Sequence, residues 1–379
     1  MKLVYLANIG LPAQWAHEIQ IMKTAEAFAA HGAEVELVVP RRLLGGQSDP
    51  FAYYNIETKF KITKLPCFDF RPGHPGAFNF WLRLLSFLFF AKLYLAFKKY
   101  DILYTREQWA GLIFKNFNFE IHVLPQPIRG WRKRVWRKAN SLIATTKSLK
   151  EQLVRLGIDE GKILVASNGL DLKNFDLAIS KEEARKNLSL PLDKKLALYV
   201  GSFYIHDWKG LDILLDSTKY FSDDYVFVLV GGERNELARI REKYQSQRLI
   251  LAGRQPYQKI PVYLKAADVL VLPNKKGQNM SESENYTSPL KLFEYLASGR
   301  PIVASDLPSV REIVNEDSAV LVEPNDPAAL AAGIKKIFSD TVLAERISQC
   351  AFQEAKKYSW QKRTELILNF IVSGTIKNA

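Results

Sequence analysis

The chain has 379 residues, of which 47% are apolar and 25% are charged. This length and composition indicate a globular protein of two domains and exclude a disordered or fibrous chain. The net charge is +13, and residues 1–176 carry a surplus of +10, so we expect an anionic partner: a phosphorylated substrate, an acidic membrane surface or nucleic acid.

Two features of the sequence bear on the cellular compartment. Cys67 and Cys350 are too few for a disulfide framework, so a reducing compartment is expected. The N-terminus, MKLVYLANIGLP, has a short apolar run broken by Gly10 and Pro12, which indicates a first β-strand and not a signal peptide. We therefore expect a cytoplasmic protein.

Apolar runs alternate with amphipathic segments along the first half of the chain, a pattern typical of parallel α/β sheets. A helix is expected at 16–30, between the first two strands. The predicted strands are residues 2–9, 33–40, 60–66, 101–107, 141–146 and 163–168.

The second half has a similar alternation, with helices expected at 208–220, 289–298 and 327–338. Its predicted strands are 196–203, 225–232, 249–254, 268–274, 301–306 and 319–324. Two such sets predict two Rossmann-like domains. The polar stretch 171–194 between them contains the expected boundary.

Residues 78–97, FNFWLRLLSFLFFAKLYLAF, form the most apolar long segment and could span a bilayer by length, at about 20 residues. Arg83 and Lys92 interrupt the segment and point to opposite helix faces. Two interpretations remain: a core helix that docks on the first sheet, or a helix that contacts a membrane.

The most informative stretch is YTSPLKLFEYLASGRPIVAS, residues 286–305. Ser288 suits a helix N-cap, Pro289 suits the first helical turn, and Gly299 suits the left-handed position after the helix end. A helix therefore begins near residue 289, close to the carboxyl end of strand 268–274, where open α/β sheets bind ligands.

The start of this helix is a candidate anion site, because unpaired N–H groups and a partial positive charge meet there. Thr287, Ser288 and the backbone of Leu290 are placed to hold a phosphate. Lys291 and Glu294 share a helix face, and the carboxylate could accept both hydroxyl hydrogens of a ribose. The alternative is that Glu294 only pairs with Lys291 or Lys275 in solvent.

A second candidate lies in VGSFYIHDWKGLDILLD, residues 200–216. Lys209 precedes an apolar-periodic helix at the same sheet edge, so it could neutralise a diphosphate with charge-assisted bonds. Taken alone, Lys209 would be an ordinary surface lysine.

These residues together resemble the GT-B glycosyltransferases, specifically the large retaining family 4. The resemblance covers nearly the whole chain, and its C-terminal motif is the specific part. The stretches that carry it are FEYLASGRPIVASDLPSVREIV (293–314), YLKAADVLVLPN (263–274), NGLD (168–171), YSW (358–360) and HGAEVELVVP (31–40).

The resemblance implies an α/β fold in which two Rossmann-like domains face each other across a cleft. In such proteins the final helix returns to the first domain. We therefore expect an acceptor-side domain of residues 1–172 plus 361–379, and a nucleotide-sugar-binding domain of residues 173–360.

The resemblance also implies residue roles. Glu294 falls on the ribose ligand, Lys209 on the diphosphate lysine and Gly10 on the N-terminal glycine loop. His122, in FEIHVLP, falls on the histidine that follows an N-domain strand and approaches the donor sugar. The implied catalytic residues are His122 and Lys209, and the implied donor-binding set is Gly10, Ser202, Lys209, Arg254, Tyr286, Thr287, Ser288, Pro289, Leu290, Lys291 and Glu294.

Two of these roles have plain alternatives. Judged from the residues alone, His122 would be a structural histidine. Arg254 ends strand 249–254 and either borders the base or is a surface residue. His17 is interpreted as a helix-face residue and not as a ligand.

The sequence departs from the family pattern at two positions. Where the family has a glutamate that holds sugar hydroxyls, this chain has Tyr286, and Glu284 or Glu282 could substitute for it. Ser202 replaces the arginine that usually partners the lysine. Loss of one such donor commonly lowers the rate by about 10²–10³, so Lys291 could cover the diphosphate instead, or the enzyme is slower, altered in donor or inactive.

The resemblance implies a retaining, hexosyltransferase-like enzyme that moves a sugar from a nucleotide-diphosphate-sugar to an acceptor hydroxyl, in cell-surface polysaccharide or glycolipid assembly. There is no Asp-x-Asp element, so no metal and no separate cofactor are expected. The alternatives are a phosphorylase-type enzyme of the same fold and a catalytically weak relative.

The basic stretch IRGWRKRVWRKA, residues 128–139, suggests a further partner. It is interpreted either as a solvated helix or, with residues 78–97, as a peripheral attachment to anionic lipid on the inner face of the membrane. A glycan or lipid-linked acceptor would fit such a place. A nucleic-acid-binding module is the least favoured alternative, because nothing resembles a groove-reading or base-stacking module.

Overall fold

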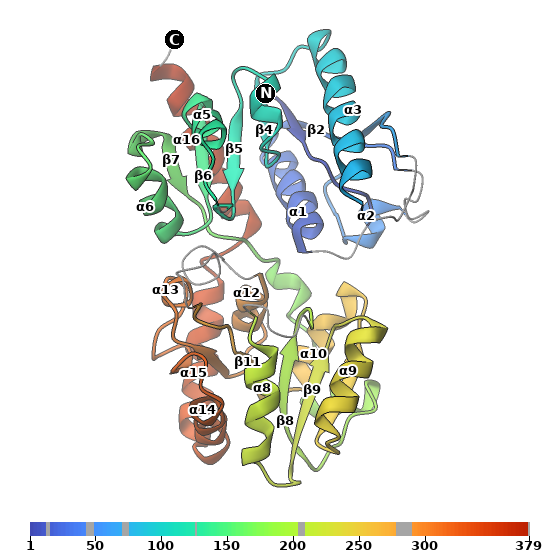
Figure 1. The fold of residues 1–379 in the computed structure, drawn as a ribbon. Coiled ribbons are helices and arrows are strands. Elements are labelled where there is room, and N and C mark those ends of the chain that lie inside the picture. Colours follow the sequence, from blue (N-terminus) through green and yellow to red (C-terminus); the bar gives the residue numbers. More distant parts are fainter. Residues whose placement is uncertain are drawn as a thin grey trace. The chain divides into compact units, whose positions relative to one another are not determined.

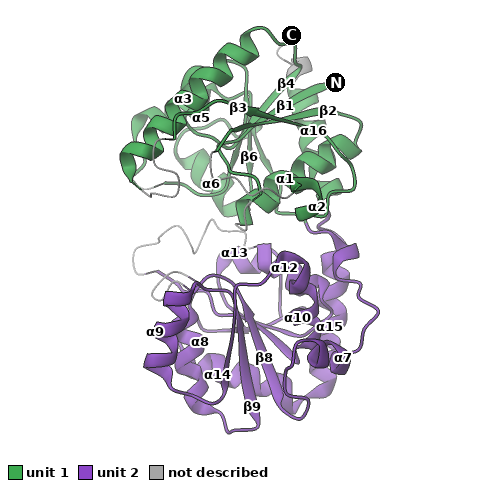
Figure 2. Cartoon of the chain, turned by 90° about the vertical axis from the view of Figure 1, so that its right-hand side faces the viewer, with its two compact units in different colours: residues 1–169, 360–379 green, residues 170–359 purple. Residues whose placement is uncertain are grey.

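The computed structural model describes residues 1–12, 16–42, 49–69, 76–125, 127–203, 209–277 and 290–377. The chain forms two compact units (Figures 1 and 2): Met1–Gly169 with Trp360–Ala379, and Leu170–Ser359. The sequence-based boundaries at residues 172 and 360 lie within three residues of these limits.

Unit 1, residues 1–169 and 360–379, is built on a parallel sheet of seven strands in the order β3-β2-β1-β4-β5-β6-β7. The direction of strand addition reverses between β1 and β4, so the sheet has a topological switch point there. The strands are β1 (Lys2–Leu6), β2 (Glu34–Pro40), β3 (Lys61–Leu65), β4 (Ile102–Thr105), β5 (Asn118–Ile121), β6 (Ser141–Ala144) and β7 (Ile163–Val165).

Helices cover both faces of this sheet (Figure 2), with α3, α5 and α6 on one side and α1, α2 and α16 on the other. Leu3 and Tyr5 of β1, and Ala7 just after it, pack in one apolar cluster with residues of α1 and α16. The helices are α1 (Ala16–Ala30), α2 (Pro50–Tyr53), α3 (Ala77–Ala96), α4 (Ala110–Ile113), α5 (Gly130–Lys138), α6 (Lys147–Arg155) and α16 (Trp360–Lys377).

Unit 2, residues 170–359, has a parallel sheet of six strands in the order β10-β9-β8-β11-β12-β13, with its switch point between β8 and β11. Its strands are β8 (Lys195–Val200), β9 (Tyr225–Val230), β10 (Leu249–Gly253), β11 (Val269–Leu272), β12 (Ile302–Ser305) and β13 (Val320–Val322). The helices include α7 (Lys181–Asn187), α8 (Leu211–Ser217), α9 (Arg234–Tyr244), α10 (Ile260–Ala266), α12 (Leu290–Ala297), α13 (Pro308–Arg311), α14 (Pro327–Ser339) and α15 (Thr341–Ala355).

The core of unit 2 follows the alternation of its strands. Leu196 and Leu198 of β8 pack with residues of α7, α10 and α12, whereas Ala197 and Tyr199 pack with residues of α8, α9 and α14. Both faces of the sheet are therefore buried, which explains why its strands read as continuous apolar runs.

The expected α/β fold of two Rossmann-like domains is confirmed, with two differences in detail. Several strands end earlier than expected, for example β1 at Leu6 and β8 at Val200, because buried residues such as Ile9 and Phe203 continue the apolar run into the following loop. The apolar pattern also missed β5, whose buried Asn118 and Glu120 hide it.

Segment 78–97 forms α3, the only helix among the described residues that is long and apolar enough to cross a membrane by those two criteria. Leu84, Phe87, Leu88, Ala91 and Leu95 on one of its faces are buried, and the helix contacts β2 and β3. The core-helix interpretation therefore holds for this face.

Two left-handed glycines of unit 2 give a matched test of packing at the switch point. Gly210 has φ +64° and a Cβ there would lie 1.7 Å from the carbonyl oxygen of Pro273, while Gly299 has φ +65° and open space. We expect Gly299→Ala to lower the free energy of unfolding by about 1–2 kcal/mol, and Gly210→Ala by on the order of 3–5 kcal/mol. Denaturant unfolding measures both, and equal losses would contradict the described contact.

Candidate functional site

The carboxyl ends of β8 and β11 bring together the candidate residues of unit 2. Gly201 and Ser202 directly follow β8, and Lys209 and Gly210 directly precede α8. The backbone of Gly210 packs against the carbonyl group of Pro273, just after β11. Lys209 is therefore fixed at the switch point, where open α/β sheets bind ligands.

Two predicted cations are linked at this place by short contacts. The Lys209 Nζ donates a hydrogen bond to the Ser202 hydroxyl. The Lys291 Nζ donates to the Tyr199 hydroxyl at 3.3 Å and lies 4.3 Å from the centre of its ring. The Tyr199 hydroxyl in turn donates to the Ser202 carbonyl oxygen at 3.3 Å. The two ammonium groups are thus held by neighbouring residues of one strand end.

Gly201 makes room for this arrangement. A Cβ at this position would lie 2.8 Å from the Tyr199 hydroxyl and 3.1 Å from the Lys291 Nζ. A side chain here would therefore displace Lys291 or Tyr199.

Glu294, one turn after Lys291 on α12, has an unusual environment. Its half-buried carboxyl accepts a hydrogen bond from the Tyr257 hydroxyl. Burial raises the pKa of Glu294 to about 7, although the Tyr257 hydrogen bond and Lys291 oppose the shift. The carboxyl therefore changes charge near neutral pH.

The remaining predicted cations of unit 2 pair with acids. Lys275 forms an ion pair with Asp212 on α8, so it is not the partner of Glu294. Arg254, which follows β10 at the sheet edge, pairs with Glu233 at 2.8 Å.

Four predicted donor-binding residues, Tyr286, Thr287, Ser288 and Pro289, lie outside the described residues, as do Glu282 and Glu284. α12 begins at Leu290 in the described part of the chain, where sequence analysis placed its start at residue 289. The expected left-handed conformation of Gly299 is confirmed by its φ of +65°.

In unit 1, the predicted glycine lies at the switch point beside β1. Gly10 is buried, and a Cβ there would lie 2.9 Å from both Cδ and Nη1 of Arg42. The Arg42 side chain therefore covers this glycine, and burial lowers the pKa of the guanidinium. His17 on α1 is half exposed and lies 3.3 Å from Glu18, which agrees with a helix-face residue.

His122 directly follows β5 and contacts the Glu120 carboxylate through Nε2. Burial and nearby Arg106 lower the pKa of His122 to about 4, against the attraction of Glu120. The imidazole is therefore neutral at pH 7. Because an ionised carboxylate only accepts hydrogen bonds, Nε2 carries the proton and Nδ1 is an acceptor.

Glu120 is itself the centre of a buried network that sequence analysis missed. It is 1% exposed, yet it pairs with Arg363 of α16 at 2.9 Å and accepts hydrogen bonds from Gln20 at 2.5 Å and from Tyr104. Burial alone would raise the pKa of Glu120, but Arg363 and His122 hold it well below its ordinary value. The carboxylate therefore joins α1, β4, β5 and α16.

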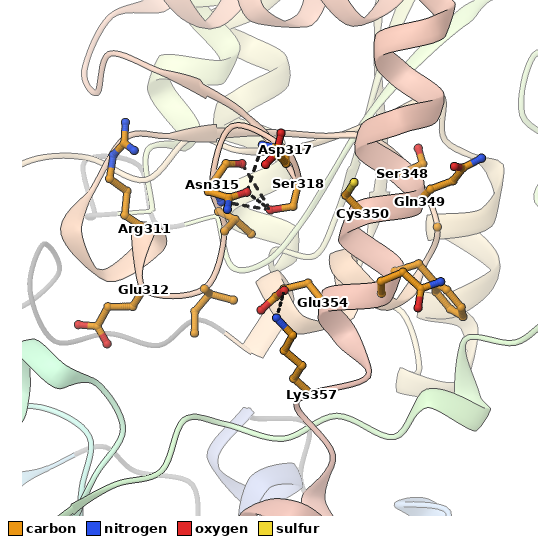
Figure 3. A pocket seen from close by; sticks show the side chains of 15 residues that line it. Arg311, Glu312, Asn315, Asp317, Ser318, Ser348, Gln349, Cys350, Glu354 and Lys357 are labelled. Atoms are coloured by element: carbon orange, nitrogen blue, oxygen red, sulfur yellow. Dashed lines mark hydrogen bonds and ion pairs between the residues drawn. The ribbon is translucent and has the colours of Figure 1, made fainter.

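A pocket of about 880 Å³ in unit 2 contains none of the predicted site residues. Figure 3 shows Asn315, Asp317 and Ser318 hydrogen-bonded within one loop, and Glu354 paired with Lys357 on the other side. These polar groups satisfy one another. The described residues also contain no cluster of three or more His, Cys, Asp or Glu that could hold a metal ion.

Comparisons with known proteins decide the family. The family "Glycosyltransferase Family 4" matches residues 17–174, and "Glycosyl transferases group 1" matches residues 194–340. The chain belongs to the GT-B glycosyltransferases of family 4. The family predicted from the sequence is thereby confirmed.

Curated relatives agree with this assignment. The D-inositol 3-phosphate glycosyltransferase of Xylanimonas cellulosilytica is 26% identical over 257 residues, which cover 64% of this chain and 59% of the relative. TuaC of Bacillus subtilis, a glycosyltransferase assigned to teichuronic acid biosynthesis, is 29% identical over 54% of this chain and 48% of its own. The matches thus span only about half to three fifths of these relatives.

Solved glycosyltransferase structures share the fold over the whole chain. The sucrose-phosphate synthase of Thermosynechococcus elongatus has a TM-score of 0.79 at 19% identity, with 100% of both chains covered. Anabaena HepE, in complex with UDP and glucose, has a TM-score of 0.76 at 17% identity and covers 98% of this chain and 100% of its own.

Sequence analysis missed three kinds of contact partner. Glu120 could have been found, because residues 120 and 122 of one strand point to the same side. Tyr199 lies in an apolar strand sequence, and its hydroxyl group is the only feature there that indicates a polar contact. Tyr257 and Arg363 are distant in sequence from their partners, and no local signal marks them.

We predict that Arg363→Met lowers the free energy of unfolding by roughly 3–5 kcal/mol, because it leaves Glu120 buried without its ion-pair partner. Adding Glu120→Gln should restore part of the loss. Denaturant unfolding at neutral pH measures both. The exposed Arg311, paired with Asp306, is the control, and its replacement by Met should cost less than about 1 kcal/mol. Equal losses for Arg363 and Arg311 would contradict the network.

Proposed function

We propose that the protein is a retaining hexosyltransferase that moves a sugar from a nucleoside-diphosphate sugar to an acceptor hydroxyl. The observation that carries the proposal is that Ser202 and Tyr199, at the end of β8, hold Lys209 and Lys291, with Glu294 one turn after Lys291 on α12. Two cations and one carboxyl match a ligand that has a diphosphate at one end and a ribose at the other.

In this proposal Lys209 and Lys291 hold the diphosphate. Family 4 enzymes usually have an arginine where this chain has Ser202. The contacts of Lys291 with Tyr199 place a second ammonium group beside the same strand end, and the Ser202 hydroxyl holds Lys209. Lys291 thus supplies the positive charge that the arginine would have supplied, aided by the backbone N–H groups expected at Ser288 and Leu290.

The reaction breaks the bond between the anomeric carbon and the diphosphate oxygen, through an oxocarbenium-like transition state. Negative charge develops on the departing diphosphate, and Lys209 and Lys291 stabilise it. The neutral His122 offers Nδ1 as an acceptor and Glu120 fixes its tautomer, so it acts on the sugar by hydrogen bonding and not by charge. Retention of configuration rests on the family resemblance.

We propose a glycan or lipid-linked acceptor on the side of unit 1, and a place in polysaccharide or glycolipid assembly. The assignment of TuaC to teichuronic acid biosynthesis supports this class of product. Because the HepE structure contains UDP, UDP is the first nucleotide to test. The absence of an Asp-x-Asp element is the reason to propose catalysis without a metal.

A thermal-shift screen with UDP, GDP, ADP and their sugar conjugates tests the proposal. A ligand at 100 times its dissociation constant should add about 2.7 kcal/mol of stability. The matching sugar conjugate should then be consumed in the presence of an acceptor glycan. No shift with any of these nucleotides would contradict the proposal, and sugar 1-phosphate formed from a disaccharide and phosphate would indicate a phosphorylase.

The two ends of the donor site can be separated by substitution. Lys209→Met should lower the affinity for the nucleoside diphosphate roughly 10–100-fold, which corresponds to the loss of one charge-assisted bond. The affinity for the nucleoside should stay nearly unchanged. Glu294→Gln should lower the affinity for both ligands. Titration calorimetry measures the four affinities, with Lys243→Met on α9 as the control. A Lys209 variant that weakens both ligands equally would contradict its assignment to the diphosphate.

Affinity should depend on pH through Glu294. About a tenth of a carboxyl with a pKa of about 7 is ionised at about pH 6, so nucleoside affinity should rise up to roughly tenfold between about pH 6 and pH 8. Without ligand, the stability of the protein should change with pH in the opposite direction. The raised pKa means that Glu294 binds more protons in the folded than in the unfolded state. The contribution of Glu294 to the free energy of unfolding therefore falls as pH rises toward 7. Glu294→Gln should abolish both effects, and a pH dependence unchanged in this variant would contradict the role.

A further inference from the structure

The outer face of α3 carries an apolar stripe that the described structure leaves uncovered. Phe78, Trp81, Leu85, Phe89 and Leu93 follow one another at steps of three or four residues, so they lie on one side of the helix. All five are exposed, with Phe78 79% and Phe89 58% exposed. Large apolar side chains gathered on one exposed surface indicate an interaction site.

The opposite face of α3 is buried inside unit 1. Leu84, Phe87, Leu88 and Ala91 have no exposed surface, and the helix contacts β2 and β3. The helix therefore lies on the sheet of unit 1 and presents only its outer stripe to a partner. This geometry fits a helix that lies in a membrane surface and not one that crosses it.

A ladder of three tryptophans links the stripe to the neighbouring helices. The rings of Trp81 and Trp109 pack edge to face with their centres 4.7 Å apart, and the ring of Trp109 stacks on that of Trp131 of α5 with their centres 4.3 Å apart. Indole rings prefer the level of the lipid headgroups, since they combine an apolar body with one polar N–H.

The charge of this part of the chain is strongly positive. Residues 76–139 contain twelve Lys and Arg and three Asp and Glu, a net charge of +9 out of +13 for the whole chain. Two of the three acids, Glu107 and Glu120, are not exposed. Arg129, Arg134 and Arg137 on or just before α5 are exposed, so positive charge reaches the surface beside the stripe.

The stripe and the basic helix belong to one layer. α3 contacts α4 and α4 contacts α5, and Figure 2 shows α3 and α5 on the same side of the sheet, opposite α1 and α16. Their solvent faces therefore point outward from the same side of unit 1.

We infer that this layer of unit 1 is a docking surface for an anionic lipid bilayer, with the α3 stripe inserted among the acyl chains and the α5 cations against the headgroups. A second copy of the protein could cover the apolar stripe, but the positive charges of the two copies would repel each other. An anionic bilayer binds both features, because apolar insertion and electrostatic attraction act together at its surface. The inference goes beyond the proposed sugar transfer and does not depend on it.

Flotation of the full-length protein with lipid vesicles tests the inference. Vesicles of phosphatidylcholine with one third phosphatidylglycerol should carry the protein upward, whereas pure phosphatidylcholine should carry much less. Binding should weaken between about 0.1 M and 1 M salt, where the Debye length falls from about 10 to 3 Å. Equal binding to both lipid mixtures, or none to the anionic one, would overturn the inference.

Two sets of variants separate insertion from attraction. Leu85→Asp with Phe89→Asp should weaken vesicle binding at least about tenfold, since each side chain loses its apolar burial. Arg129→Gln, Arg134→Gln and Arg137→Gln should each weaken it by up to about fivefold and flatten its salt dependence. Unchanged binding in either set would overturn the assigned surface.

The matched control lies on the opposite layer of the same unit. Leu366 and Val372 of α16 are 54% and 42% exposed, and their replacement by Asp should leave vesicle binding unchanged. Far-UV circular dichroism and the unfolding midpoint establish that every variant is folded. Sedimentation velocity examines the competing occupant: a dimer that Leu85→Asp with Phe89→Asp dissociates, without vesicle binding by the original protein, would overturn the lipid assignment.

Discussion

The arrangement on which the candidate site depends is a pair of ammonium groups held at the end of a single strand. Lys209 is held by the Ser202 hydroxyl, and Lys291 lies on the ring of Tyr199, three residues earlier. A diphosphate bound at this strand end would attract both ammonium groups. Gly201 and Gly210 allow the arrangement, because a side chain at Gly201 would collide with Lys291 and one at Gly210 with the carbonyl group of Pro273.

The two units shift the pKa of a buried or half-buried carboxyl group in opposite directions. In unit 1, Glu120 is kept ionised by Arg363 and by hydrogen bonds, and the neutral His122 takes its tautomer from that carboxylate. In unit 2, Glu294 accepts a hydrogen bond from Tyr257, and burial raises the pKa of Glu294 to about 7. An ionised carboxylate has about four acceptor sites, so it can bind a ligand's hydroxyl groups as well as the Tyr257 hydroxyl.

Much of the fold followed from the sequence, because strands buried on both faces and helices with caps leave strong local patterns. The left-handed conformation of Gly299, two residues after the end of α12, is such a case. The site was harder to predict, because its details are contacts between distant residues: Tyr257 with Glu294, Tyr199 with Lys291 and Arg363 with Glu120. No periodicity encodes such pairs. The apolar pattern missed the strand that carries Glu120, because two of its four buried residues, Asn118 and Glu120, are polar.

Hydrogen–deuterium exchange with and without a nucleoside diphosphate is the most direct test of the location of the site. The account predicts protection of the backbone amides around Ser202, Gly210 and Lys291 on nucleotide addition, where β8 ends and α8 and α12 begin. Peptides that contain Asn315 and Glu354, which line the pocket of Figure 3, should be unchanged. Protection at that pocket, with none at residues 201–210 or 290–297, would contradict the central claim.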